Sequence, residues 1–389
     1  MTDAARSGRP DPVIDLAAVR ASDAPRVGPK MARLGPLASA GWRVPDGYAI
    51  TAAALEGWLP PAALAELHRL FSAPVSGAAA GVGPGPDGGG HQRLARLSKQ
   101  ARQLIEDQPL PSWLADAVAD AHARLEARTG RGAALLVAVR SSAVGEDGHT
   151  ASFAGQYETY LGVSGTDEVL RHIAKCWASG YSAHALEYRR RFGGSSPLRA
   201  HDLAVGVLEL VDARSAGVAF TLDPVTGDRG RLVVEANWGL GESVVSGQVT
   251  PDYWTVEHGT GRILERRTGG KLVWSVLGEA GEAGGRGTVL APLPAELAQA
   301  PCLTDDEVRY LCRQAAAIEA AEGTPQDVEW AIARDLDVPD SVYFLQHRPE
   351  TTWSTPSPAA PSPGAPPAPG KSFDPVQYAL RNVFKVPGT

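Results

Sequence analysis

Hydrophobic side chains recur at intervals of three or four residues along much of the chain, a spacing that places them on one face of a helix. This pattern predicts helices over residues 52–71, 92–129 (as two helices), 165–192 and 305–322. The last of these starts with Thr304 and Glu307, which have the spacing of a capping box. Shorter apolar or alternating runs predict strands over residues 13–16, 48–51, 133–139, 202–211, 231–235, 327–332 and 342–347.

Segments rich in Gly, Pro, Ala and Ser separate these elements and lack the side chains of a core. We expect disorder over residues 1–12, a flexible surface insertion over 72–91, mostly loop over 278–300 and a linker over 354–371. The tail, residues 372–389, carries a few apolar side chains and fits either a docking peptide or a disordered end. The rest of the chain divides into residues 13–200 and 201–353.

Composition is that of an ordinary globular protein, with 43% hydrophobic and 21% charged residues among 389. A net charge of −7 argues against a broad nucleic-acid surface, although it allows a local basic pocket. No apolar run approaches the roughly 18 residues that a membrane span requires, and the N-terminus has no apolar signal segment. The three scattered cysteines suit neither a disulfide framework nor a zinc site, so we expect a cytoplasmic protein.

The first candidate site, one suited to binding phosphate, lies between Ala133 and Val163. There an apolar strand ends at Arg140 and two serines, and a loop rich in Gly, Ser, Thr and acidic residues follows. A guanidinium group beside a small-residue loop can bind phosphate oxygens. The same residues also fit an ordinary surface turn.

A second cation, Lys30, follows a Gly-Pro turn at the start of a predicted helix that ends near Gly41. The start of a helix carries partial positive charge, which disfavours a lysine unless an anion is bound there. Lys30 is therefore either a phosphate ligand or a solvated side chain.

Two strands near residue 340 concentrate polar groups. Asp327 and Glu329 alternate with apolar residues and so lie on one face of the first strand, while Gln346 and Arg348 flank the end of the second. Carboxylate and amide oxygens suit Mg²⁺ bound to nucleotide phosphates, and Arg348 can neutralise phosphate charge. An exposed hairpin with Glu–Arg cross-strand pairs is the alternative interpretation.

Several motifs, in one order from Lys30 to Thr351, resemble the nucleotide-binding domain of the phosphoenolpyruvate synthase and pyruvate phosphate dikinase family. The family's Gly-Gly-Lys-Gly start is replaced here by Gly-Pro-Lys-Met, in which Pro29 removes one N–H group. The other matching segments are residues 137–159, 202–211, 216–227, 237–247, 325–331 and 345–351.

This resemblance implies an α+β, ATP-grasp fold with two subdomains, mainly antiparallel sheets, and a nucleotide cleft between them. It implies ATP and Mg²⁺ as cofactors. Catalytic and phosphate-binding roles would belong to Lys30, Arg140 and Arg348, and metal binding to Asp327, Glu329 and Gln346. Gln346 would also contact the nucleotide, as would Glu242 and Glu209, although Glu209 fits a surface residue equally well.

Members of the family pass phosphate from ATP to a histidine on a swivelling domain, and none of the nine histidines here lies in the corresponding motif. The resemblance therefore implies an ATP-dependent phosphotransferase subunit, similar to the nucleotide-domain subunit of phenylphosphate synthase. Its partner would be a separate subunit that carries the swivelling phosphohistidine domain. Two other functions stay open: a self-contained small-molecule kinase and a non-catalytic nucleotide-sensing subunit.

Overall fold

The computed structural model describes residues 11–72, 89–144, 158–192, 203–281, 285–334 and 336–353. The predicted N-terminal disorder, the 72–91 insertion, the linker and the tail lie wholly or mainly outside these residues, as does the loop over 145–157. Internal contacts divide the chain into two units: Met1–Pro36, Asp46–Leu210 and Glu279–Gly287 form the first, and Leu37–Pro45, Val211–Gly278 and Thr288–Thr389 the second. The division falls after Leu210 rather than at residue 200, because the strand in between pairs with the first unit's sheet.

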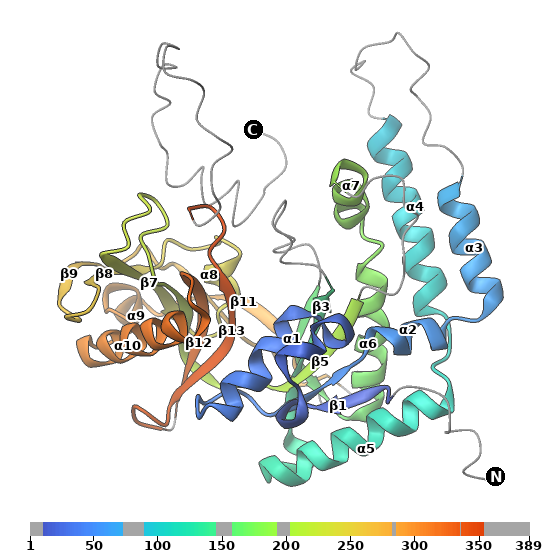
Figure 1. The fold of residues 1–389 in the computed structure, drawn as a ribbon, viewed down its shortest axis with the longest axis horizontal. Helices are drawn as coiled ribbons and strands as arrows, with labels where there is room; N and C mark the ends of the chain where they lie inside the picture. Colours follow the sequence, from blue (N-terminus) through green and yellow to red (C-terminus); the bar gives the residue numbers. More distant parts are fainter. Residues whose placement is uncertain are drawn as a thin grey trace. The chain divides into compact units, whose positions relative to one another are not determined.

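The first unit is built on a five-stranded antiparallel sheet in the order β1-β2-β5-β3-β4. Its strands are β1 (Val13–Asp15), β2 (Gly47–Ile50), β3 (Leu136–Ala143), β4 (Thr159–Ser164) and β5 (Leu203–Glu209). Its helices are α1 (Ala24–Ser39, which runs into the second unit), α2 (Ala52–Trp58), α3 (Pro61–Ser72), α4 (Gly89–Glu106), α5 (Ser112–Thr129), α6 (Thr166–Ser179) and α7 (Ala183–Phe192). Figure 1 shows these helices gathered around the sheet.

Alternating apolar side chains of β3 and β5 join the helices in one buried core. Trp177 of α6 is central to it: the ring is 1% exposed, and its indole N–H donates to the backbone oxygen of Leu203 at 2.8 Å. This core holds β3 between β5 and β4, so the polar residues at the end of β3 occupy a fixed position.

The predicted single helix over residues 165–192 is wrong. The structure has two helices there, because α6 ends at Gly180 and Ser182 begins a new turn by accepting a hydrogen bond from the N–H of Ala185 at 3.1 Å. The four-residue spacing of apolar side chains continues across the break, so the pattern alone did not reveal it.

The second unit contains a six-stranded antiparallel sheet in the order β13-β12-β6-β7-β8-β9. Its strands are β6 (Ala213–Phe220), β7 (Arg231–Trp238), β8 (Asp252–Glu257), β9 (Ile263–Arg267), β12 (Gln326–Ala333) and β13 (Val342–Pro349). The other elements are a two-stranded sheet of β10 (Val273–Leu277) and β11 (Thr288–Pro292), and helices α8 (Glu242–Val245), α9 (Ala295–Gln299) and α10 (Asp305–Glu322). Helices and antiparallel sheets in both units confirm the α+β class.

Helix α10 has the predicted bounds, and the capping box is confirmed: Thr304 and Glu307 each accept a hydrogen bond from the other's backbone N–H. The stripe of Val308, Leu311 and Ile318 on α10 is fully buried. The predicted loop over 278–300 is wrong in part, because β11 pairs with β10 over five positions and α9 follows. The partner strand β10 lies before the predicted loop, so the Gly- and Ala-rich composition of residues 278–300 did not indicate the pairing.

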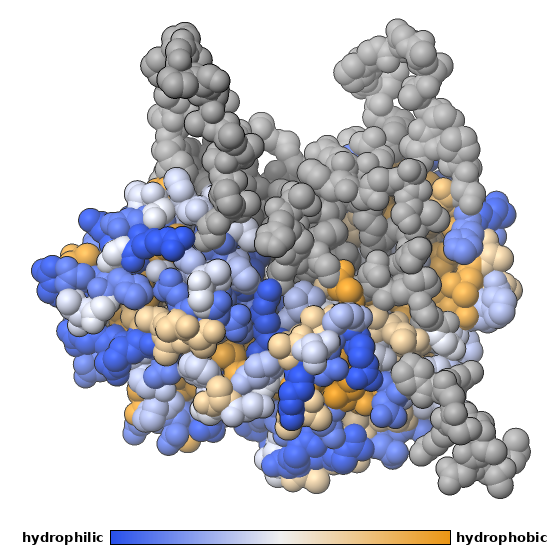
Figure 2. Space-filling model, viewed as in Figure 1, coloured by the Kyte–Doolittle hydropathy of each residue, from blue (hydrophilic) through white to orange (hydrophobic). Residues whose placement is uncertain are grey.

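The surface of the second unit around β8, β9 and α10 is mainly hydrophilic in Figure 2. Charged side chains there form exposed ion pairs, including Arg266 with Asp305 and Arg309 with Asp306. Exposed pairs of this kind contribute little to stability. Functional residues are expected instead where polar groups are withdrawn from solvent.

Candidate functional site

In the first unit, the turn that carries Lys30 lies directly against the end of β3. Gly28 breaks helix α1 with φ 71° and ψ 162°, a conformation that is essentially reserved for glycine. A Cβ atom at Gly28 would lie 2.3 Å from the backbone oxygen and from the hydroxyl oxygen of Ser142. The helix resumes at Pro29, a residue that suits the first position of a helix, so the altered sequence of this turn is compatible with the helix start.

The residues at the end of β3 are partly or fully buried. Arg140 is half-buried and pairs in register with Gly206 of β5 and Thr159 of β4. The Ser142 side chain is 0% exposed, and its hydroxyl group has no hydrogen-bond partner among the residues that the structure describes. The structure thus brings the Lys30 turn and the Arg140 strand together within one unit.

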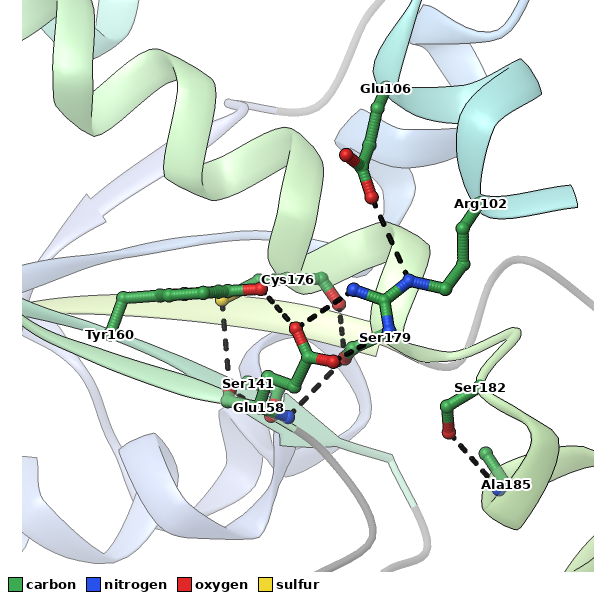
Figure 3. Close-up of polar contacts among 9 residues, drawn as sticks. All are labelled: Arg102, Glu106, Ser141, Glu158, Tyr160, Cys176, Ser179, Ser182 and Ala185. Carbon is green, nitrogen blue, oxygen red and sulfur yellow. Dashed lines mark hydrogen bonds and ion pairs between the residues drawn. The ribbon is translucent and has the colours of Figure 1, made fainter. Parts of the chain in front are cut away.

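A polar cluster that sequence reasoning missed holds this strand end (Figure 3). Arg102 of α4 donates to both carboxylate oxygens of Glu158, at 2.7 and 3.1 Å, and the Tyr160 hydroxyl also donates to Glu158. The backbone oxygen of Glu158 accepts from the Ser141 hydroxyl at 3.2 Å. Glu158 therefore links α4 to the residue next to Arg140. Glu158 lies inside the matching 137–159 segment. Arg102 lies in no motif, and in the sequence it cannot be told from other charged residues on a helix surface.

Cys176 lies beneath the same cluster and is fully buried. Burial raises the pKa of its thiol, and the positive charge of Lys30 acts on that pKa in the opposite direction. The thiol is therefore neutral and unreactive.

Glu209 is engaged in an ion pair. Its carboxylate accepts from the Arg131 guanidinium at 2.8 Å, and its backbone N–H donates to the oxygen of Asp46 at 2.7 Å. It lies three positions along β5 from Gly206, the residue opposite Arg140. Its predicted contact with a nucleotide stays a prediction.

In the second unit, strands β12 and β13 bring four predicted residues together. Asp327 lies directly opposite Arg348, and Glu329 directly opposite Gln346, before a bulge shifts the register. Cross-strand neighbours point to the same face of a sheet, so two carboxylates, an amide and a guanidinium converge as the sequence predicted.

Asp327 is the most perturbed acid of this group. Arg348 donates to its Oδ2 at 3.1 Å, while its buried Oδ1 has no hydrogen-bond partner in the described part of the chain. Burial raises the pKa of Asp327 to about 6; Arg348 lowers it, and the negative charges of Glu350 and Glu329 raise it further. A buried carboxylate oxygen without a donor is costly, and a bound cation would compensate it.

The residues present fit Mg²⁺ rather than a metal held by protein ligands alone. The described residues contain no group of three or more His, Cys, Asp or Glu side chains arranged around a metal position. Mg²⁺ is usually bound by one or two carboxylates together with phosphates and water. Asp327, Glu329 and the amide oxygen of Gln346 supply that number of protein ligands.

Glu242 begins helix α8 at the end of β7. Its carboxylate accepts from the Ser275 hydroxyl at 2.8 Å. The preceding Gly239 has φ 77°, and a Cβ atom there would lie 2.4 Å from the Ser275 backbone oxygen. The Gly-rich turn is thus pinned against β10, and Glu242 is held at one end of the second unit's sheet.

Asp252 and Lys271 form a buried ion pair in the second unit. Both side chains are 0% exposed. The Lys271 ammonium donates to Asp252 and to the Ala300 oxygen, and the Asp252 carboxylate also accepts from the N–H groups of Gly269 and Cys302. These hydrogen bonds join Asp252 to residues 269–271 and to residues 300–302, so the pair holds three segments of the chain together.

The first unit thus has a cationic strand end, and the second unit has an acidic hairpin. Residues 24–363 match the family described as pyruvate phosphate dikinase, AMP/ATP-binding domain, and the chain belongs to this family.

Curated relatives carry the names of phosphotransferases. The chain is 39% identical to rifampicin phosphotransferase of a Streptomyces species over 341 residues, which are 87% of this chain and 36% of that protein. It is 35% identical to a probable phosphoenolpyruvate synthase of Staphylothermus marinus over 366 residues, 88% of this chain and 41% of the relative. Phosphoenolpyruvate synthase of Pyrococcus furiosus is also 35% identical, over 85% of this chain and 42% of the relative. The chain thus spans about two fifths of these relatives.

Among the described residues, no helix is both long enough and apolar enough to cross a membrane.

Proposed function

We propose that this chain is an ATP-grasp nucleotide-binding domain that uses Mg-ATP as a phosphate donor. The observation that carries the proposal is the β12–β13 hairpin, where Asp327 and Glu329 face Arg348 and Gln346 in register. In the described part of the chain, one buried Asp327 oxygen has no donor. The match to an AMP/ATP-binding family supports a nucleotide as the ligand.

The proposal assigns a different task to each unit. In the first, Lys30 and Arg140 bind phosphate oxygens, because the turn that carries Lys30 lies against the strand end that carries Arg140. In the second, Asp327, Glu329 and Gln346 hold Mg²⁺, and Arg348 stabilises negative charge beside them. Mg²⁺ bound there would neutralise the phosphates and polarise the bond that breaks. Glu242 and Glu209 contact the nucleoside part.

We further propose that the phosphate passes to a histidine on a separate domain or subunit, as in a dikinase half-reaction. If the bond between the β- and γ-phosphates breaks, the γ-phosphoryl group forms a phosphorus–nitrogen bond to the imidazole and ADP leaves. If the bond between the α- and β-phosphates breaks, a pyrophosphoryl group is transferred to the imidazole and AMP leaves; water then releases the terminal phosphate and leaves phosphohistidine. Support comes from the names of the relatives, which are a rifampicin phosphotransferase and phosphoenolpyruvate synthases. A cytoplasmic location is part of this proposal, because all three cysteines are buried and free.

Product analysis tests the proposal. Purified chain would be incubated with Mg-ATP, with and without a phosphohistidine domain from a relative, and AMP and ADP would be separated. We expect AMP that depends on the added domain and disappears in Glu329→Gln. ADP formed by the chain alone with a small acceptor would indicate a self-contained kinase instead. Nucleotide binding without turnover under any condition would indicate a sensing subunit and would overturn the proposal.

A further inference from the structure

Strand β10 makes three hydrogen bonds with the Gly-rich turn between β7 and α8 and with the residues on either side of it. The Asn237 side-chain amide donates to the Val273 oxygen at 3.0 Å, and the Leu240 N–H donates to the Ser275 oxygen at 2.8 Å. The third bond runs from the Ser275 hydroxyl to the Glu242 carboxylate, at 2.8 Å. Strand β10 therefore contacts the chain before the turn, within it and at the first residue of α8.

Ser275 takes part in two of these three bonds and is itself held firmly. It is 3% exposed, and β10 pairs with β11 over five positions, with Ser275 opposite Leu290. Gly239 packs on the same residue, since a Cβ atom there would lie 2.4 Å from the Ser275 backbone oxygen. A hydroxyl group on a buried and paired strand keeps its position, so it is a fixed donor beside α8.

Glu242 has no such support from its own segment. It is half-buried and begins a helix of only four residues. A glutamate side chain has much rotamer freedom to lose when it is ordered. The Ser275 hydroxyl donates to one carboxylate oxygen, Oε2, and so selects one orientation of the group. The direction of the Glu242 carboxylate is therefore determined by a residue on another strand.

We propose that Ser275 is a positioning residue for nucleotide binding, whose hydroxyl holds the Glu242 carboxylate in the orientation that meets the nucleoside part of ATP. This inference rests on the proposed function, which assigns that contact to Glu242. Ser275 acts through Glu242, because its own hydroxyl is buried and already donates to the carboxylate. A group that is ordered before the ligand arrives loses less freedom on binding, which strengthens the affinity.

Calorimetric titration of Mg-ATP against variants of the hydroxyl group tests the proposal. Ser275→Ala removes the donor and should weaken Mg-ATP binding on the order of tenfold, the size of effect for a hydrogen bond to a charged group. Ser275→Thr keeps a hydroxyl at the same position and should retain most of the affinity. Thr288→Ala is the matched control: it removes a hydroxyl from β11, the partner strand of β10, and should leave the affinity unchanged.

A double-mutant cycle shows whether Ser275 acts through Glu242. Glu242→Ala removes the carboxylate that Ser275 holds, so adding Ser275→Ala to this variant should cause no further loss of Mg-ATP affinity. Residues in direct contact are expected to be non-additive in this way. If Ser275→Ala weakens binding by the same factor with and without the Glu242 carboxylate, Ser275 acts independently of Glu242 and the proposal is wrong.

The other outcomes are distinguishable as well. Unchanged affinity in Ser275→Ala, or an equal loss in Ser275→Ala and Ser275→Thr, overturns the positioning role while leaving Mg-ATP binding intact. Absence of Mg-ATP binding by the unmodified chain overturns the proposed function itself. Thermal unfolding shows whether each variant is folded. If Ser275→Ala is not, Ser275→Cys takes its place, because a thiol is similar in size and only a weak donor, and the same loss is expected.

Discussion

Two aspartates of the second unit, Asp252 and Asp327, each have a cationic partner and yet differ in what surrounds them. Asp252 is 0% exposed and accepts from Lys271 and from two backbone N–H groups, so both oxygens are occupied. Asp327 accepts from Arg348 through one oxygen, and its other oxygen is buried and has no donor among the residues that the structure describes. The first arrangement is complete without a ligand, and the second is incomplete.

Whether every hydrogen bond of a buried acid is made distinguishes a structural ion pair from a binding site better than the burial of the acid does. A buried pair with every hydrogen bond made holds segments together, and removing one partner leaves an uncompensated charge. An acid with an unmatched oxygen lowers stability until a cation or donor arrives, which is a property of binding sites. Asp252 should therefore matter to folding, and Asp327 to ligand binding.

The largest effect is expected on the structural side. Lys271→Met leaves the Asp252 carboxylate buried without its cation and should lower the free energy of unfolding by about 3–5 kcal/mol, measured by chemical denaturation. Arg266→Met removes the cation from an exposed pair with Asp305 and should cost less than about 1 kcal/mol. Similar losses in the two variants would show that the Asp252 pair has no special structural role.

Asp327→Asn should weaken ligand binding without lowering stability, in contrast to Lys271→Met. It removes a proposed Mg²⁺ ligand, so Mg-ATP affinity should fall at least as far as the roughly 10- to 100-fold that follows loss of a group supporting a metal ligand. The free energy of unfolding without ligand should stay the same or rise, because a desolvated charge is removed. A large loss of stability, with Mg-ATP affinity unchanged, would place Asp327 in the same class as Asp252.

The pH dependence gives a finer test of the same contrast. The pKa of Asp327 is raised to about 6 in the folded state, above the value of about 3.9 for an unfolded chain. The folded state therefore binds more protons between about pH 4 and 6, and the Asp327 contribution to stability decreases as pH rises through this window. Mg²⁺ requires the ionised form, so its stabilising effect on the folded chain should be larger at pH 7.5 than at pH 5. Denaturation curves should show both effects in the unmodified chain and neither in Asp327→Asn: the loss of stability as pH rises from about 4 to 6, and the greater stabilisation by Mg²⁺ at pH 7.5 than at pH 5. The same pH dependence in both proteins would contradict the assignment.

The smallest effect is expected at the Arg102–Glu158 pair of the first unit. Both side chains are about one third exposed, so Arg102→Gln should cost less than about 1 kcal/mol of unfolding free energy. The pair nevertheless fixes the residue beside Arg140, so ATP affinity should fall more than stability does. Titration of ATP against Arg102→Gln and Arg102→Lys checks this: the lysine variant should recover part of the affinity, and equal loss in both without any recovery would argue against a positioning role.

Local sequence patterns predicted the arrangement of the hairpin residues and the start of helix α10 in the second unit. Alternation placed Asp327 and Glu329 on one face, and the register of β12 with β13 confirms that Gln346 and Arg348 lie opposite them. The capping box at Thr304 set the start of α10 correctly. These features depend on neighbours in the chain, or on a hairpin, and so leave a signal in the sequence.

Features that depend on distant partners were not predictable in the same way. The contact of Ser275 with Glu242 requires β10 to pack beside the Gly-rich turn, and the contact of Arg102 with Glu158 requires a helix to dock beside a sheet. Gly28 showed a turn in the sequence, but its close approach to Ser142 became visible only in the structure. The sequence likewise did not distinguish Asp252 from Asp327, because the difference lies in backbone donors brought from elsewhere.

The most direct test of the central claim is a calorimetric titration of ATP with and without Mg²⁺, on the unmodified chain and on Glu329→Gln. If the β12–β13 hairpin holds the metal ion of the nucleotide, Mg²⁺ should strengthen ATP binding to the unmodified chain and have little effect on the variant, while thermal unfolding of the two ligand-free proteins stays similar. An equal Mg²⁺ effect on both proteins would show that the metal ion binds elsewhere and would contradict the account.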